Sequence, residues 1–186
     1  MNIGIDIDDT ITDTYDMLIP LIAMHYDINL NKLLDQKPTY KMLDKTLHDF
    51  AKFKRDTLAA MGKIVPLKKG VNDVLSKLRE EGHKIIFITA RNYNEYEDPY
   101  KITFEYLKAN NVPFDKLLVD VKDKASACVL EGIDLFIDDN TLNCKAVQNK
   151  GIDTLQFDAK FLRDIKALKR VYSWEEIYKI VKDMCA

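Results

Sequence analysis

Short apolar runs alternate with helical patterns along most of this chain, and this alternation limits the folds that are open to it. Five runs are strand candidates: Asn2–Ile7, Lys84–Thr89, Lys116–Val121, Asp134–Asp138 and Asp153–Phe157. Most are apolar at successive positions, which is typical of strands buried on both faces. Between them, apolar residues recur at helical spacing, as in Val71, Val74, Leu75 and Leu78. The sequence therefore predicts an α/β fold, a Rossmann-like parallel sheet with helices on both faces.

One segment interrupts the alternation. From residue 14 to residue 64 we find no good strand candidate, only helical patches at Tyr15–Met24 and His48–Met61. A helical insertion between the first strand and the rest of the sheet indicates a small cap over the sheet edge. We therefore expect an α/β core made of residues 1–13 and 65–186, and an all-helical cap made of residues 14–64.

Composition and charge exclude several classes of protein. With 28 basic and 30 acidic side chains the net charge is −2, so no overall positive field is available to hold a nucleic-acid scaffold or an anionic membrane. The longest apolar run, Met17–Met24, is far shorter than the roughly 20 residues that cross a bilayer. Acidic residues interrupt the N-terminus before a secretory apolar region can form, and the three cysteines show no CxxC spacing. We expect a cytoplasmic protein with no membrane partner.

Carboxylates gather where two of the predicted strands end. Asp6 and Asp8 follow the first strand, and residues two apart on an extended chain point the same way. Asp138 and Asp139 follow the fourth strand candidate. The carboxyl ends of parallel strands open on one edge, so these side chains are expected to share a small volume, where their mutual repulsion requires a cation. Oxygen ligands without His or Cys suit a hard ion such as Mg²⁺.

Donors of hydrogen bonds follow two other strands. Thr89 and Arg91 follow the second strand candidate, and Lys122 and Lys124 follow the third. Each feature alone has an ordinary explanation, because a threonine after a strand often caps a helix and a lysine is usually solvated. All of them, however, directly follow predicted buried strands. This coincidence indicates a site for an incoming phosphate dianion.

These four segments resemble the ordered motifs of the haloacid dehalogenase-like hydrolase superfamily. The motif residues are Asp6-Ile7-Asp8-Asp9-Thr10, Thr89, a downstream lysine and Asp138-Asp139. The resemblance covers about residues 1–12 and 66–160, and the insertion stands where that superfamily places one type of cap. Within the superfamily, the chain is similar to the 5′(3′)-deoxyribonucleotidase-like branch through Ile88–Arg91, Pro113–Leu117 and Leu135–Asp139. That branch often has serine where this chain has Ala90.

The resemblance implies hydrolysis of a phosphomonoester in two steps. Asp6 is expected to attack phosphorus and form an aspartyl-phosphate, and an ionised Asp needs no activating base. Asp8 is expected to protonate the leaving alkoxide and then to activate water, with a pKa raised by neighbouring carboxylates. Both Lys122 and Lys124 fit the third motif. We prefer Lys124, because it begins a helical stretch, as the family's lysine usually does.

The same resemblance implies the remaining ligands. Mg²⁺ is expected to bind Asp6, the backbone carbonyl of Asp8, and Asp138. The substrate phosphoryl group is expected to meet four residues: Thr89, Ala90, Arg91 and Lys124. Asp139 and Thr10 are expected to lie just outside the residues that bind the metal and the phosphoryl group, and to hold those residues in place.

The resemblance to the 5′(3′)-deoxyribonucleotidase-like branch implies a (deoxy)ribonucleoside monophosphate as the substrate, so the chain is expected to be a 5′-nucleotidase. Four aromatic residues in or near the cap could stack on a base or simply pack the cap: Tyr15, Tyr40, Phe50 and Phe53. A sugar phosphate or a phosphorylated end of a nucleic acid stays open as the substrate. The non-enzymatic alternative is a phospho-accepting receiver domain, but that fold carries its phosphorylated Asp on a middle strand and its lysine on the last one. The oligomeric state cannot be predicted.

Overall fold

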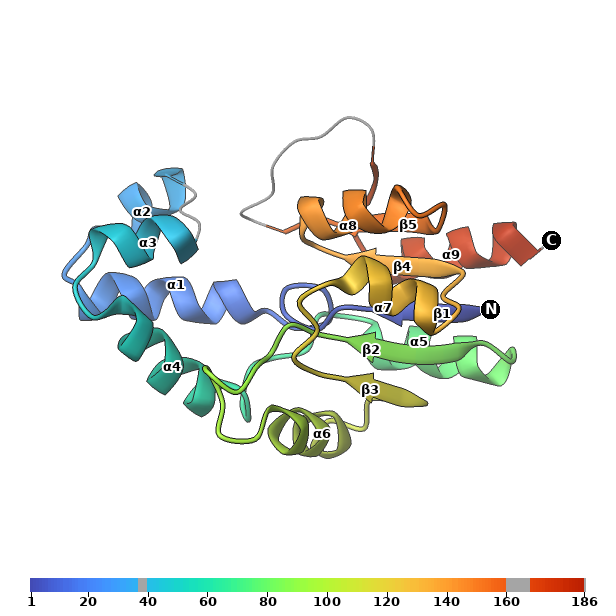
Figure 1. Cartoon of the computed structure of the whole chain (residues 1–186), viewed down its shortest axis with the longest axis horizontal. Helices are drawn as coiled ribbons and strands as arrows, with labels where there is room; N and C mark the ends of the chain where they lie inside the picture. The colour runs from blue at the N-terminus through green and yellow to red at the C-terminus, as the bar shows by residue number, and fades with distance from the viewer. Residues whose placement is uncertain (37–39, 160–167, 186) are drawn as a thin grey trace.

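The computed structural model describes residues 1–36, 40–159 and 168–185, and in these ranges six parallel strands form one sheet (Figure 1). The strand order is β3-β2-β1-β4-β5-β6. The strands are β1 (Asn2–Ile5), β2 (Lys84–Ile88), β3 (Lys116–Leu118), β4 (Leu135–Asp138), β5 (Asp153–Phe157) and β6 (Lys169–Val171). The helices are α1 (Thr14–His25), α2 (Leu30–Gln36), α3 (Tyr40–Thr46), α4 (Phe50–Met61), α5 (Val71–Glu80), α6 (Pro99–Ala109), α7 (Lys124–Leu130), α8 (Thr141–Gln148) and α9 (Trp174–Cys185). The predicted α/β class is confirmed.

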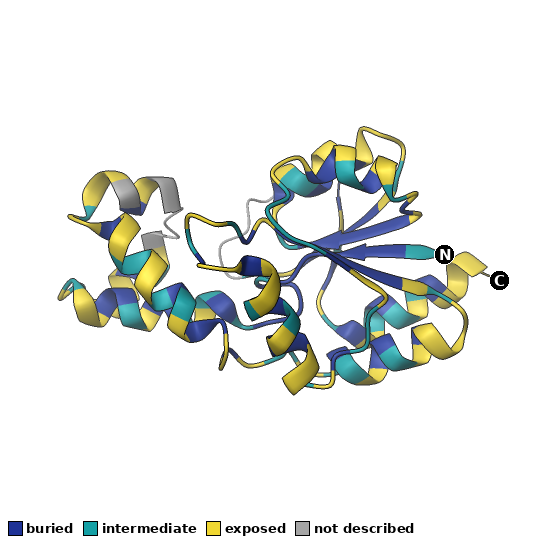
Figure 2. Ribbon diagram, turned by 60° about the horizontal axis from the view of Figure 1, so that its bottom comes forward, coloured by how far each residue is buried: buried dark blue, intermediate teal, exposed yellow. Residues whose placement is uncertain are grey.

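Both faces of the sheet are buried, as the apolar runs predict. Ile3 and Ile5 of β1 belong to a core cluster that includes side chains of α5, α6 and α9. The opposite face packs on α7 and α8, in a cluster that contains Phe136. Gly4 faces this second cluster closely, because a Cβ at that position would lie 3.1 Å from Cδ2 of Phe136. Figure 2 shows the resulting continuity of buried residues along the central strands.

The sheet contains one strand more than the five candidates. β6 pairs in parallel with β5, with Leu155 opposite Lys169 and Phe157 opposite Val171. Its three residues, Lys-Arg-Val, include two basic side chains, so it lacks the apolar run by which the other strands are recognised. A short, charged strand is what a sheet edge tolerates, and β6 is an edge strand.

Helices α1 to α4 lie beyond the carboxyl ends of the strands (Figure 1). They bury an apolar cluster that includes Leu18, Ile22 and Phe50, and Tyr96 from the loop after β2 is also a member of it. The chain enters and leaves this helical group side by side: Thr12 forms an antiparallel bridge with Leu67. None of the described helices has the length and apolar character needed to cross a membrane.

Candidate active site

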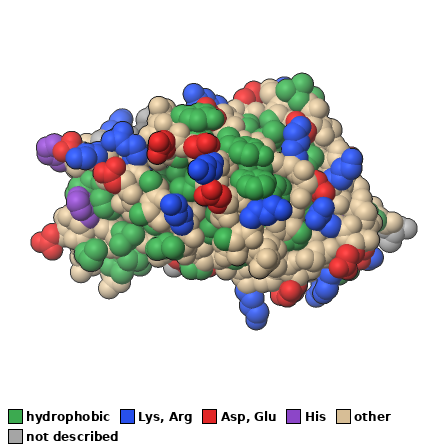
Figure 3. Space-filling model, turned by 90° about the horizontal axis from the view of Figure 1, so that it is seen from below, with side chains coloured by type: hydrophobic (Ala, Val, Ile, Leu, Met, Phe, Trp, Pro, Cys, Tyr) green, Lys and Arg blue, Asp and Glu red, His purple; other side chains and the backbone are tan. Residues whose placement is uncertain are grey.

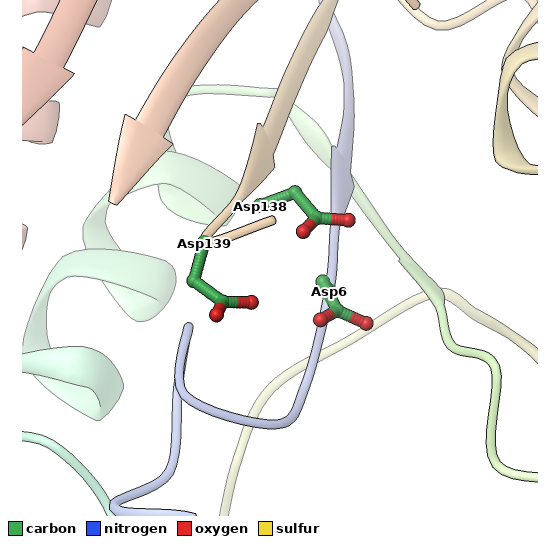
Figure 4. Close-up of side chains that lie close together, drawn as sticks. All are labelled: Asp6, Asp138 and Asp139. Carbon is green, nitrogen blue, oxygen red and sulfur yellow. The ribbon is translucent and has the colours of Figure 1, made fainter. Parts of the chain in front are cut away.

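The acidic residues of two distant segments meet at the centre of the sheet. β1 and β4 are neighbours with Ile5 opposite Ile137, and the amide of Asp6 donates to the carbonyl of Ile137 at 2.9 Å. Asp6 and Asp138 therefore stand next to each other where their strands end. One carboxylate oxygen from each of Asp6, Asp138 and Asp139 lies within 4.8 Å of the others (Figure 4). Asp139, which was expected to share this volume and to support the metal ligands, is part of this carboxylate cluster.

Lys124 is the cation in contact with this carboxylate cluster. Its Nζ lies 2.6 Å from Oδ1 of Asp6 and 2.7 Å from Oδ2 of Asp138. It is the first residue of α7, whose start is fixed by Asp123, because the Asp123 side chain accepts from the amide of Ser126. Lys122, the other candidate from the sequence, is exposed in the loop before the helix. The structure thus brings Lys124, and not Lys122, to the carboxylates.

One lysine does not neutralise the carboxylate cluster. Burial raises the pKa of Asp6 to about 7, although Lys124 offsets part of this effect. Burial, with the charges of Asp138 and Asp6, also raises the pKa of Asp139 well above its usual range. The same two charges raise the pKa of Lys124 despite its burial, so the lysine stays protonated. The donor set is therefore rich in negative charge and made of oxygen atoms, and it fits a hard divalent cation such as Mg²⁺.

Asp8 is not part of the carboxylate cluster and is paired with Arg91 instead. Nε and Nη2 of Arg91 donate to its two carboxylate oxygens at 2.9 and 2.8 Å, and Oγ1 of Thr14 donates at 2.8 Å. Burial favours a raised pKa, but the charge and hydrogen bonds of Arg91 outweigh it and hold the pKa of Asp8 below its usual value. The expected upward shift from neighbouring carboxylates is therefore wrong, because Arg91 is the closer charge.

Neighbouring loops complete the surroundings of the acidic residues. The Thr89 amide donates to the carbonyl of Leu118, and the Thr89 hydroxyl accepts from the amide of Arg91 at 3.3 Å. A cavity of about 280 Å³ opens in front of these groups. Its lining includes Asp6, Asp8, Thr14, Tyr15, Leu58, Thr89, Ala90, Arg91, Asn92, Glu95, Tyr96, Lys124, Asp139, Asn140 and Asn143. The cavity thus combines the strand ends with side chains from α1 and α4.

Several supporting residues were not identified from the sequence. Asn143 of α8 donates to Oδ2 of Asp138 at 3.0 Å, and the backbone amide of Asn140 donates to Oδ1 at 2.6 Å. Trp174 is a third such residue, because its indole donates to the carbonyl of Thr10; Thr10 itself was expected to support the site, and its hydroxyl accepts from the amide of Asp139 at 3.0 Å. The position of Asn143, within the first turn of a helix after an acidic strand end, is the only signal that could have indicated it.

The cap aromatics have different surroundings. Tyr15 lines the cavity, whereas Phe50 is buried in the apolar cluster of the helical group. The ring of Phe53 packs 4.4 Å from that of His25, centroid to centroid, in an outer groove of α1 and α4. The side chain of Tyr40 lies outside the described part of the structure. Figure 3 shows one face of the molecule, on which acidic and basic side chains are interspersed.

Comparisons with known proteins agree with this geometry. Residues 1–186 match the family described as 5′ nucleotidase, deoxy (Pyrimidine), cytosolic type C protein. The chain belongs to this family. It is 30% identical over 185 residues to a nucleotidase of Clostridium acetobutylicum, covering 97% of this chain and 93% of that one. It is 25% identical to a protein of Chlorobaculum tepidum named provisionally as a 5′(3′)-deoxyribonucleotidase, covering 97% of this chain and 89% of the other.

Solved structures show the same fold at lower identity. A predicted phosphatase from Clostridium acetobutylicum superposes with a TM-score of 0.70 at 17% identity, covering 98% of both chains. A haloacid dehalogenase-like hydrolase from Streptococcus pneumoniae gives 0.66 at 14% identity, covering 97% of both. The resemblance to the haloacid dehalogenase-like superfamily is confirmed, and family membership makes the chain a hydrolase of phosphoric monoesters with a small phosphorylated substrate.

Proposed function

We propose that this protein is a Mg²⁺-dependent nucleotidase that hydrolyses (deoxy)ribonucleoside monophosphates through a phosphorylated Asp6. The observation that carries the proposal is the convergence of three carboxylates and Lys124 beneath a cavity lined by Thr89. The family description, which names a deoxy and pyrimidine type, supports the nucleotide as substrate. Its word "cytosolic" supports a cytoplasmic location.

In the proposed first step, an Asp6 carboxylate oxygen attacks the phosphorus atom of the substrate. A bond forms between that oxygen and phosphorus, and the bond from phosphorus to the nucleoside oxygen breaks. The Lys124 ammonium, 2.6 Å from Asp6, keeps the nucleophile oriented and reduces its repulsion with the incoming phosphate. Thr89 lines the same cavity, and its hydroxyl would hold a phosphoryl oxygen in this step.

Asp8 is the proposed proton carrier. It donates a proton to the departing nucleoside oxygen and then takes one from the water that attacks phosphorus, so that Asp6 is released. In the free protein Arg91 favours the ionised form, which is ready for the second step. A bound phosphate group adds negative charge beside Asp8, and this charge favours the protonated form needed for the first step.

Asp6, Asp138 and the backbone carbonyl of Asp8 would hold the metal ion, and Asp139, whose carboxylate lies within 4.8 Å of those of Asp6 and Asp138, would be near enough to join them. When bound, Mg²⁺ would supply positive charge against the phosphoryl oxygens and lower the repulsion between two anions. Asn143 and the backbone amide of Asn140 orient Asp138 for this role through their hydrogen bonds.

We further propose that residues 14–64 act as a cap on a core made of residues 1–13 and 65–186. The apolar cluster formed mainly by α1 to α4 and the antiparallel bridge from Thr12 to Leu67 support this division. Tyr15 and Leu58 bring this cap into the cavity wall, where they can contact the nucleoside and limit the entry of water.

The test is a substrate panel with a nucleophile variant. Phosphate release is measured as kcat/KM on deoxy- and ribonucleoside monophosphates and one sugar phosphate, with Mg²⁺ or with EDTA. We expect Mg²⁺-dependent turnover that is highest on a nucleotide. Asp6→Asn is expected to lose turnover to the detection limit because the amide is not a nucleophile for phosphorus. Asp153→Asn is the matched control. Asp153 is the first residue of β5, at the amino end of the strand and away from the carboxylate cluster, so this variant is expected to keep wild-type turnover.

Two results would count against these roles. Turnover that survives in Asp6→Asn removes Asp6 as the nucleophile, and activity that is equal in EDTA removes the metal. A sugar phosphate as the best substrate keeps the phosphatase chemistry but replaces the nucleotide as substrate class.

A further inference from the structure

The side chain of Arg91 is already paired with another residue of the protein. It is 3% exposed, and its Nε and Nη2 pair with both oxygens of Asp8 in a bidentate arrangement. Its Nη1 lies 3.4 Å from Oγ1 of Thr103, and its guanidinium lies 5.8 Å from the ring centroid of Tyr96. The donors of this side chain are thus directed at protein groups on both sides.

The exposed member of the pair is the carboxylate. The Asp8 side chain is 32% exposed, against 2% for Arg91, so a molecule in the cavity meets Asp8 before it meets the guanidinium. A substrate phosphate that bound Arg91 would have to displace Asp8 and break a buried bidentate pair. Such pairs are among the stronger polar contacts in proteins, and their geometry is fixed by the planar guanidinium.

We infer that Arg91 is a positioning residue that holds the Asp8 carboxylate in place for proton transfer, and that it does not bind the substrate phosphoryl group. This inference rests on the proposed function. The orientation of Asp8 is fixed from two sides, by Arg91 after β2 and by Thr14 at the start of α1. Proton transfer requires the donor within hydrogen-bond reach of the departing oxygen, so a carboxylate that is free to rotate would transfer its proton poorly.

Two substrates with different leaving groups can distinguish a positioning role of Arg91 from a phosphate-binding role. A nucleoside departs as an alkoxide and needs a proton from Asp8, whereas p-nitrophenolate is stable without one. The value of kcat/KM covers only the steps up to the departure of the leaving group. A variant in which Asp8 is misplaced should therefore lose kcat/KM on a nucleotide and keep it on p-nitrophenyl phosphate. A variant that has lost a phosphate contact should lose both.

The experiment compares Arg91→Gln and Arg91→Lys with wild type on the best nucleotide of the panel and on p-nitrophenyl phosphate. For Arg91→Gln we expect kcat/KM to fall about 10²- to 10³-fold on the nucleotide and less than about fivefold on p-nitrophenyl phosphate. Inhibition by inorganic phosphate is expected to stay within about twofold of wild type, since no phosphate contact is removed. Arg91→Lys keeps the positive charge but cannot form the bidentate pair. It should show the same difference in kcat/KM between the two substrates, with smaller losses, and it provides the test if the Gln variant does not fold.

Arg79→Gln is the matched control. Arg79 forms a bidentate pair of the same type with Asp115, at 3.2 and 2.7 Å, away from the cavity, and this variant should match wild type on both substrates. Equal losses on the two substrates in the Arg91 variants, or weaker inhibition by phosphate, would overturn the inference while the proposed function stands. A wild-type protein that releases phosphate from neither substrate would refute the proposed function and the inference with it.

Discussion

At the scale of single residues, the turn after β1 shows what it costs to bring carboxylates together. Asp9 is buried in this turn with a φ of 60°, a conformation that Asp and Asn adopt more readily than most residues. Its Oδ1 accepts from the amide of Tyr15, and its Oδ2 is buried without a partner among the described residues. Burial raises the pKa of Asp9 to about 8, so ionisation of this group opposes folding at neutral pH.

The expected consequence is a pH dependence of stability. The folded pKa lies above the unfolded value of 3.8, so the folded state holds a proton that the unfolded state has lost, and stability falls as pH rises from 3.8 to about 8. Asp9→Asn keeps the acceptor and the tolerated φ but cannot ionise. We expect it to exceed the wild-type free energy of unfolding by about 1–3 kcal/mol at pH 8 and to show little difference below pH 4.

Urea unfolding in EDTA at several pH values measures this difference. Asp153→Asn, at an exposed position at the start of β5, serves as a control for the general loss of one carboxylate. A difference between Asp9→Asn and wild type that does not change with pH would contradict the assignment.

At the scale of secondary structure, the start of a helix decides which lysine reaches the site. α7 begins at Lys124 because Asp123 caps it, with bonds to both the amide and the hydroxyl of Ser126. A side chain at the first turn is held in a fixed direction, and the direction here is toward the ends of β1 and β4. Two residues earlier, the loop leaves Lys122 in solvent.

Lys124→Met and Lys122→Met should therefore behave differently. Removing a preorganised cationic donor from a phosphoryl-transfer site is expected to lower kcat about 10²- to 10³-fold, as for other donors that stabilise developing charge. The Lys122 variant removes the same charge from solvent and should keep kcat within about twofold of wild type. Steady-state kinetics on one nucleotide decides between them, and equal losses would show that the loop, rather than Lys124, carries the effect.

At the scale of the whole molecule, a parallel sheet supports a cluster of charges that no local segment could hold. Residues 132 positions apart place Asp6 beside Asp138, and α8 and the Trp174 end of α9 support their loops. The raised pKa values of Asp6 and Asp139 mean that their ionised forms are unfavourable in this buried place unless a cation balances their charge. A divalent cation bound there would therefore stabilise the whole fold.

Excess Mg²⁺ is expected to raise the melting temperature relative to EDTA. A ligand that binds only the folded state at 100 times its Kd adds about 2.7 kcal/mol of stability. Asp138→Asn should lose most of this shift, whereas Asp115→Asn, which lies outside the carboxylate cluster, should keep it. Thermal unfolding with and without the metal measures both. An Asp138→Asn variant that responds to Mg²⁺ as wild type does would place the ion elsewhere.

The sequence alone determined the α/β alternation, the parallel sheet and the edge at which the acidic residues collect. It could do so because burial on both faces leaves an apolar run in each central strand, and because parallel strands end on the same side. β6 escaped this reasoning, since an edge strand of three residues carries no such run.

Only the tertiary structure decided how the charges pair. The sequence places Arg91 and Asp8 83 residues apart, and both stood as candidates for direct contact with substrate or metal. Which of several carboxylates an arginine binds depends on differences of a few ångströms between loops. The same limit gave Asp139 only a supporting role beside the expected metal ligands, and it left the choice of Lys124 over Lys122 as a preference. Patterns along a chain specify which strand ends meet, whereas packing between helices and loops specifies which side chains touch.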